Sequence, residues 1–201
     1  MILPVVVYGD PVLRKVGIEI DENYENLEGL ITDMFETMYN SKGVGIAAPQ
    51  IGKSIRLFII DASPFADIDE DDEEEDQLSK VERKYLSEFK KIFINPKIIQ
   101  EEGKEWKFNE GCLSIPKIRE DVVRKEKITL EYQDENFKSH KEDFSGIAAR
   151  IIQHEYDHIE GKLFIDRISP LRRKLISGKL NNISNGKVST DYKIKVYQKK
   201  K

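Results

Sequence analysis

Two of the three histidines in this 201-residue chain lie four residues apart, in the segment HEYDH at 154–158. On a helix, residues four apart lie nearly above one another, so His154 and His158 would present both imidazoles to one metal ion. Glu155 follows the first histidine, where its carboxylate can reach a water at the metal without being a ligand itself. This pattern indicates a hydrolytic metal centre, but it does not identify the bond that is cut.

The third ligand of such a centre has to come from elsewhere, because a hydrolytic zinc-type site uses three protein ligands and a water. The remaining histidine, His140, lies in an alternating segment among charged residues and is interpreted as a surface residue. A carboxylate or Cys112, the single cysteine, is left as the third ligand. A lone cysteine is most often a small buried hydrophobe, so its neighbours decide between these interpretations.

Those neighbours belong to one of three motifs that occur in order along the chain: GVGIAAPQIG at 43–52, EGCLSIP at 110–116 and HEYDHIEG at 154–161. Together the three motifs resemble the bacterial type of peptide deformylase, and the segment LFIDR at 163–167 continues the similarity. The resemblance implies a metal-dependent hydrolase that removes the formyl group from the N-terminal formylmethionine of nascent polypeptides and releases formate.

The resemblance also implies the metal site. Its ligands would be Cys112, His154 and His158, holding one divalent ion per chain. Spacing alone favours zinc, because a soft sulfur ligand with imidazoles suits that metal. The family resemblance instead implies Fe²⁺ in the cell, with Zn²⁺, Ni²⁺ or Co²⁺ as replacements.

The remaining site residues follow from the same resemblance. Glu155 is expected to act as general base and then as general acid. Gln50 and the backbone N–H of Leu113 are expected to donate hydrogen bonds to the carbonyl oxygen of the substrate. The peptide is expected to add itself as an extra strand. The residues expected to bind it are Gly43, Val44 and Gly45.

Two other functions remain open on the residues alone. One is an HExxH metallopeptidase with a different third ligand, which replacement of Cys112 would distinguish. The other is a non-catalytic, ribosome-associated homologue whose metal is structural. The presence of both Glu155 and Gln50 argues against that second alternative, because neither residue is needed merely to hold a metal.

The elements that must position these residues indicate the α+β class. Apolar residues at helical spacing predict a helix over 25–40, and a second helix over 146–160 carries the histidines. Between them we predict strands at 55–60 and 92–99, and alternating strands over 122–132 and 137–144. Because Asn95-Pro96 lies inside the strand at 92–99, that strand is expected to be an edge strand or to carry a bulge there. The expected fold has short antiparallel β-sheets packed around a central metal-binding helix, with an N-terminal helix and a C-terminal helical tail.

Charge divides the chain unevenly. Nine of the ten residues at 67–76 are acidic, and removing these nine from the 37 acidic residues leaves 28 against 33 basic ones. We predict one catalytic domain over 1–170 with a mobile acidic insertion at about 62–88. The basic segment 171–201 is predicted to be a solvated, mobile tail. The functional alternative is docking on the ribosome, and the structural alternative is a helix that packs on the core.

Location and partners follow from composition. No run of 18 apolar residues occurs, so no membrane partner is expected, and a cytoplasmic protein is the expectation. Sequence-specific nucleic-acid binding is not expected either. The main expected partner is the N-formylmethionyl nascent peptide that the resemblance implies.

Some residues near the motifs leave alternatives open. Glu110 is expected to pair with Arg119 or Arg124, either behind the metal site or on the surface. Asp157 would orient a ligand histidine or face solvent. The family commonly has arginine-glycine after the cysteine motif, whereas this chain has Arg119-Glu120. That departure puts the local turn and any substrate role of Arg119 in doubt.

Overall fold

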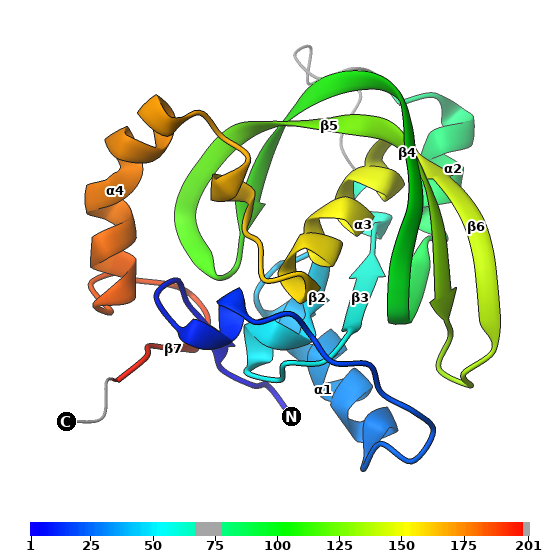
Figure 1. Ribbon diagram of the computed structural model, residues 1–201, viewed down its shortest axis with the longest axis horizontal. Coiled ribbons are helices and arrows are strands. Elements are labelled where there is room, and N and C mark those ends of the chain that lie inside the picture. The colour runs from blue at the N-terminus through cyan, green and yellow to red at the C-terminus, as the bar shows by residue number, and fades with distance from the viewer. Residues whose placement is uncertain (67–77, 199–201) are drawn as a thin grey trace.

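The computed structural model describes residues 1–66 and 78–198 (Figure 1). Among these residues the α-helices are α1 (Leu27–Asn40), α2 (Lys80–Ser87), α3 (Gly146–Ile159) and α4 (Pro170–Ser184). The strands are β1 (Val5–Val6), β2 (Gly45–Ala47), β3 (Leu57–Asp61), β4 (Lys90–Cys112), β5 (Ile115–Gln133), β6 (Ser139–Ser145) and β7 (Ile194–Lys195). Short 3₁₀ helices are η1 (Pro11–Arg14), η2 (Ala48–Ile51), η3 (Ser63–Phe65) and η4 (Phe164–Asp166). The acidic run at 67–76 lies outside the described residues. The described part of the predicted insertion at 62–88 contains η3 and α2.

The main sheet has the strand order β2-β3-β4-β5-β6, and each neighbouring pair is antiparallel. Strand β2, which begins at Gly45, therefore forms one edge of this sheet. A separate two-stranded parallel sheet joins the two ends of the chain, with Val5 opposite Ile194. The predicted α+β class with an antiparallel sheet and helices packed on it is confirmed.

Strands β4 and β5 are much longer than predicted, at 23 and 19 residues. The sequence indicated several short strands here because residues 100–105 are polar or glycine, and all of them are exposed in the structure. Pairing continues through this stretch with several register shifts, one of which falls between Ile94 and Lys97. This irregularity is the bulge predicted at Asn95-Pro96, and Asn95 has a positive φ of 49°. The two strands curve around α3, as Figure 1 shows.

Helix α3 lies against the main sheet, as predicted for the helix that carries the histidines. Its small and apolar side chains, including Ala148, Ala149 and Ile152, pack in one cluster with Phe58 and Phe93 of the sheet. The alanines allow close approach of helix and sheet, and the apolar contacts remove the buried face of α3 from water. The helix ends at Ile159, and Gly161, two residues further on, has a φ of 68° that suits glycine.

Helix α1 forms a second core with strands β2 and β3, next to the glycine-rich motif at 43–52. Met34 and Met38 are fully buried there beside Ile46 of β2 and Ile59 of β3. The two methionines are therefore core residues, as their helical spacing indicated. Because β2 and β3 contribute side chains to both cores, the segment that carries Gln50 has little freedom to move.

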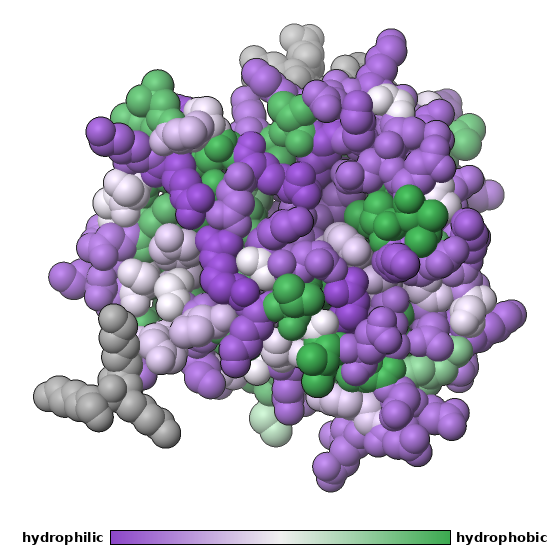
Figure 2. Space-filling model, in the orientation of Figure 1, coloured by the Kyte–Doolittle hydropathy of each residue, from purple (hydrophilic) through white to green (hydrophobic). Residues whose placement is uncertain are grey.

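The C-terminal part continues as helix α4, and the chain then returns toward the N-terminus. Ile176, Leu180 and Ile183 pack with Phe164 in a third apolar cluster, so the helical tail rests on the core at least through these residues. The return through β7 to the side of β1 was not predicted. Hydrophilic side chains cover most of the face in Figure 2, and hydrophobic ones form small separate groups. Over the described ranges, we find no helix with the length and apolarity needed to cross a membrane.

Candidate metal centre and active-site cleft

The three predicted ligands meet at one place. Cys112 lies at the end of β4, and His154 and His158 lie one turn apart on α3. One ligand atom from each residue lies within 4.8 Å of the others, and Sγ of Cys112 is 3.3 Å from Nε2 of His158. His140 lies outside this group on β6, half-buried, with its Nε2 2.7 Å from a carboxylate oxygen of Asp134.

The protonation state of Cys112 fits a metal ligand. Burial alone would raise the pKa of its thiol, but the neighbouring imidazoles of His158 and His154 lower that pKa to about 5. Cys112 is therefore a thiolate at neutral pH, the form that binds metals. One thiolate and two imidazoles within reach of a single point form a donor set that fits a divalent transition metal.

Glu110 fixes the orientation of His154. Its buried carboxylate accepts a hydrogen bond from Nδ1 of His154 at 2.8 Å, so Nε2 is left for the metal. Arg124 donates two further bonds to this carboxylate, at 2.7 and 2.9 Å, and Arg150 donates one at 2.9 Å. Burial opposes ionisation of Glu110, but Arg124 and His154 hold its pKa well below its usual range. Glu110 is thus a buried anion behind the metal site rather than half of a surface pair.

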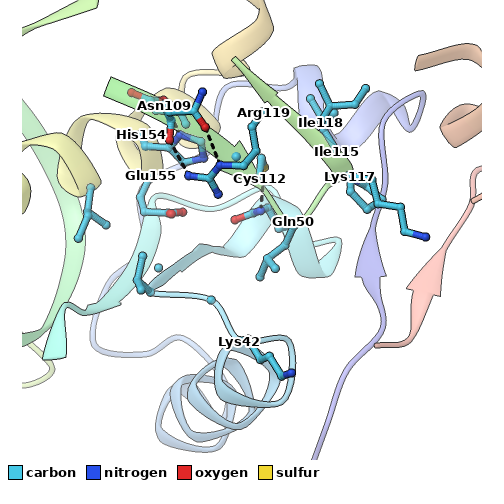
Figure 3. Close-up of a pocket in the computed structure, with 18 of the residues that line it drawn as sticks. Lys42, Gln50, Asn109, Cys112, Ile115, Lys117, Ile118, Arg119, His154 and Glu155 are labelled. Atoms are coloured by element: carbon cyan, nitrogen blue, oxygen red, sulfur yellow. Dashed lines mark hydrogen bonds and ion pairs between the residues drawn. The ribbon is translucent and has the colours of Figure 1, made fainter. Parts of the chain in front are cut away.

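Of the two arginines predicted to pair with Glu110, only Arg124 does so. Arg119 instead donates to the side chain and the backbone carbonyl of Asn109, at 2.8 and 2.6 Å (Figure 3). Its neighbour Glu120 is buried and accepts two hydrogen bonds from Arg172 at 2.9 and 3.0 Å. The unusual glutamate therefore ties β5 to α4.

Asp157 contacts Arg124, the residue that pairs with Glu110, rather than a predicted metal ligand. It is buried, so it does not face solvent, and it does not contact a ligand imidazole through any hydrogen bond in the described structure. Instead its carboxylate accepts from Arg124 at 2.7 Å and twice from Arg167 at 2.6 Å. Asp157 therefore holds Arg124, which in turn holds Glu110 against His154.

Glu155 lies beside the ligands with its carboxylate buried. Burial raises the pKa of Glu155 to about 7, close to the value that suits a group exchanging protons at neutral pH. Its Oε2 has no hydrogen-bond partner among the described residues, which fits a carboxylate that meets a water or a substrate. The backbone of Gly45 approaches it so closely that a Cβ there would lie 2.5 Å from Oε1.

Gln50 reaches the same site from η2. Its Oε1 accepts a hydrogen bond from the N–H of Ala47 at 2.8 Å, which turns the amide so that its nitrogen faces the cysteine motif. That nitrogen lies 3.3 Å from Oγ of Ser114 and 3.5 Å from Sγ of Cys112. The amide of Gln50 is thus a buried donor aimed at the metal site, as Figure 3 shows.

These groups open into a cleft of about 470 Å³. The predicted peptide-binding residues Gly43, Val44 and Gly45 line it, together with Leu113. Strand β2 is an edge strand, so one side of its backbone has no neighbouring strand in the main sheet. Apolar side chains also contribute to the lining; they are Phe65, Phe108, Ile115, Ile118 and Ile151.

The sequence analysis missed two groups at this site. Arg150 lies four residues before His154 on α3, and this helical spacing was a usable signal for a residue on the same face. The segment 189–192 also lines the cleft, although it lies far from every motif. Tyr192 donates from its hydroxyl to the carbonyl of Leu113 at 2.8 Å. No feature of the sequence indicated that contact.

Comparison with known proteins places the chain among related sequences and structures. Residues 2–174 match the family model described as polypeptide deformylase. Peptide deformylases of Christiangramia forsetii and Flavobacterium johnsoniae are 55% and 57% identical over 201 residues, covering 100% of this chain and 99% of each relative. A crystal structure of a peptide deformylase from Legionella pneumophila is 37% identical with a TM-score of 0.74, over 93% of this chain and 98% of that one.

Proposed function

The chain belongs to the polypeptide deformylase family, which removes the formyl group from nascent peptides, and we propose how its residues carry out this reaction. The observation that supports the proposal most strongly is the convergence of Cys112, His154 and His158 at the base of a cleft that Glu155 and Gln50 also line, with His158 buried behind the lining. The two alternatives, a metallopeptidase with another third ligand and a non-catalytic homologue, are not favoured by the comparisons.

We propose that Cys112, His154 and His158 hold one divalent metal ion. When bound, the ion supplies a Lewis acid for the formyl carbonyl and makes a water more acidic, because one thiolate and two neutral imidazoles leave it a net charge of +1. The chain keeps this donor set in place through Glu110, which orients His154. Fe²⁺ is the proposed physiological metal, with Zn²⁺, Ni²⁺ or Co²⁺ as replacements.

Glu155 is proposed to move the proton. As a carboxylate it accepts a proton from the attacking water, and as a carboxylic acid it gives that proton to the leaving amine. Its pKa of about 7, raised by burial, allows both forms near neutral pH. The products are formate and a free N-terminal amine.

Gln50 and Leu113 are proposed to stabilise the negative charge that develops on the formyl oxygen. The amide nitrogen of Gln50 is fixed in direction by its bond to Ala47. The N–H of Leu113 directly follows Cys112 in the chain and belongs to the same turn. A fixed donor of this kind is worth about 3 kcal/mol of transition-state stabilisation.

The peptide is proposed to lie along the edge strand β2. Gly43, Val44 and Gly45 line the cleft, and the backbone of Gly45 would pair with the substrate as an added strand. A formyl group carries no side chain, so it fits where the close approach of Gly45 to Glu155 leaves little room. This restriction favours formylated over acetylated peptides.

Two further proposals concern the rest of the chain. Residues 1–170 are proposed to form the catalytic domain, with an insertion at about 62–88. The basic tail 171–201 is proposed to bring the enzyme to the ribosome, where nascent chains emerge, and we propose a cytoplasmic location accordingly.

Deletion of 171–201 is not a clean test, because Tyr192 contacts the active-site turn. Neutralising the exposed Lys174 and Lys179 tests ribosome cosedimentation without touching the cleft.

The reaction is tested with the peptides formyl-Met-Ala-Ser and acetyl-Met-Ala-Ser under anaerobic conditions, with iron or nickel supplied. We expect release of formate and a new free amine from the first peptide and at least 100-fold slower hydrolysis of the second, a ratio that corresponds to ~3 kcal/mol. Cleavage of the Met-Ala bond would instead support the peptidase. No formate from the metal-loaded protein would overturn the proposed function.

A further inference from the structure

We infer that Tyr192 is a positioning residue for the deformylation reaction. Its hydroxyl holds the turn that carries Leu113 in place. The inference rests on the proposed function, because Leu113 is the proposed donor to the formyl oxygen. The contact joins residues 79 positions apart and brings the C-terminal segment into the active site.

The turn between β4 and β5 is held from several sides. Tyr192 donates to the carbonyl of Leu113 at 2.8 Å, and the N–H of Tyr8 donates to the carbonyl of Ser114 at the same distance. Gln50 reaches Oγ of Ser114 at 3.3 Å. Tyr8 near the N-terminus and Tyr192 near the C-terminus therefore hydrogen-bond to the carbonyls of two consecutive residues in one turn, immediately after the proposed ligand Cys112.

The two terminal segments that contact this turn are also paired with each other. Strand β7 begins two residues after Tyr192 and pairs with β1, and the N–H of Val5 donates to the carbonyl of the intervening Lys193 at 2.9 Å. The hydroxyl of Thr190 donates to the carbonyl of Tyr192 at 2.7 Å and closes a local turn. Tyr192 is thus presented to the cleft by a fixed backbone rather than by a free tail.

The geometry explains why the hydroxyl matters more than the ring. The bond to the Leu113 carbonyl restrains rotation about the Cα–C bond of Leu113. The pairing of Cys112 with Ile115 restrains the residue on the other side, so the peptide group that carries the Leu113 N–H is held at both ends while charge develops on the substrate oxygen. Loss of this restraint would misalign a transition-state donor, while the peptide would still bind along β2. Such a loss lowers kcat and leaves KM nearly unchanged.

The test is Tyr192→Phe, which removes the hydroxyl and keeps the ring. We expect kcat for formyl-Met-Ala-Ser to fall about 3- to 10-fold, the worth of one neutral hydrogen bond, with KM within twofold of the wild type. In the zinc-loaded protein, the amide ¹H–¹⁵N resonance of Leu113 should shift and its hydrogen exchange should quicken. Tyr197→Phe, an exposed tyrosine further along the segment, is the matched control.

A Tyr192→Phe protein whose kcat stays within 1.5-fold of the wild type would overturn the inference, as would a loss carried by KM alone. Urea unfolding of both variants checks that the fold is intact, so that a lower kcat is not a smaller folded fraction. A wild-type protein that releases no formate would contradict the proposed function itself, a failure visible before any variant is compared.

Discussion

Glu110 accepts a hydrogen bond from Nδ1 of His154 at 2.8 Å, and this bond decides which imidazole nitrogen is available to a metal. The carboxylate remains ionised although it is only 4% exposed, because Arg124 and Arg150 neutralise it. The geometry of the metal site therefore depends on a buried charge network that contains no metal ligand except His154. Mutation of residues in such networks commonly lowers metal affinity or activity, although these residues do not bind the metal themselves.

Replacement of Glu110 by glutamine should weaken metal binding by about 10- to 100-fold. Glutamine keeps the shape, but it lacks the charge that holds the His154 imidazole and balances the two arginines. Competition with a chelator at low temperature, where the variant stays folded, measures the affinity. Glu101→Gln, at an exposed position of β4, serves as the control and should match the wild type. An unchanged affinity in folded Glu110→Gln protein would refute the proposed role of Glu110.

Replacement of Cys112 by alanine should abolish stable metal binding and reduce formate release by more than 100-fold, because two imidazoles alone form an incomplete site. Metal content after gel filtration and formate release measure the two effects. Retention of both metal and activity would show that another residue is the third ligand, as in the metallopeptidase alternative.

Gly45→Ala tests the close contact between β2 and Glu155. A Cβ at Gly45 would lie 2.5 Å from Oε1 of Glu155, so the carboxylate has to move. We expect a loss of stability of about 1–3 kcal/mol and a marked fall in kcat. Gly178→Ala is the matched control, because a Cβ there meets no atom within 4 Å and alanine favours a helix such as α4. Equal kcat values for Gly45→Ala and the wild type would contradict the described packing.

Asp166 should contribute stability that is lost in acid. Burial alone would raise its pKa, but hydrogen bonds from Arg14 and from the N–H of Leu163 lower it overall. Because the folded-state pKa lies below the unfolded value of about 3.9, the contribution is present above pH 4 and disappears as pH falls through the folded-state pKa. Asp166→Asn should therefore lose up to about 1 kcal/mol at pH 7, since the pair with Arg14 is partly exposed.

Urea unfolding at pH 7 and pH 3 measures this difference, with Glu25→Gln as an exposed control. The difference in free energy of unfolding between the wild type and Asp166→Asn should be smaller at pH 3 than at pH 7. A gap of equal size at both values would show that the carboxylate contributes through its shape and not through its charge.

The residues with direct chemical roles could be proposed from the sequence, whereas those that support them could be proposed only in part. Metal ligation restricts residue type and spacing together, so Cys112 and the two histidines stand out within one chain. Arg150 and Asp157 act through contacts between β4, β5 and α3, and such long-range pairing leaves no short motif. Tyr192 is the extreme case, since its partner lies 79 positions away.

The fold was predictable to a similar degree. Helices α1 and α3 show helical apolar spacing because each packs one face on the sheet. The middle of β4 does not show strand alternation, since residues 99–105 are exposed on both faces. Its pairing with β5 is set by the neighbouring strand rather than by its own side chains. The short parallel pairing of β1 with β7 involves two residues of each strand, too few for any pattern.

The central claim is that Glu155 transfers the proton in a site held by Cys112, His154 and His158, and Glu155→Gln tests it most directly. The variant keeps the three ligands, so we expect one metal ion per chain, as in the wild type. Formate release from formyl-Met-Ala-Ser should fall by about 10²- to 10⁴-fold, the range typical of losing a general acid–base group. A variant that binds metal and releases formate at more than a tenth of the wild-type rate would contradict the claim.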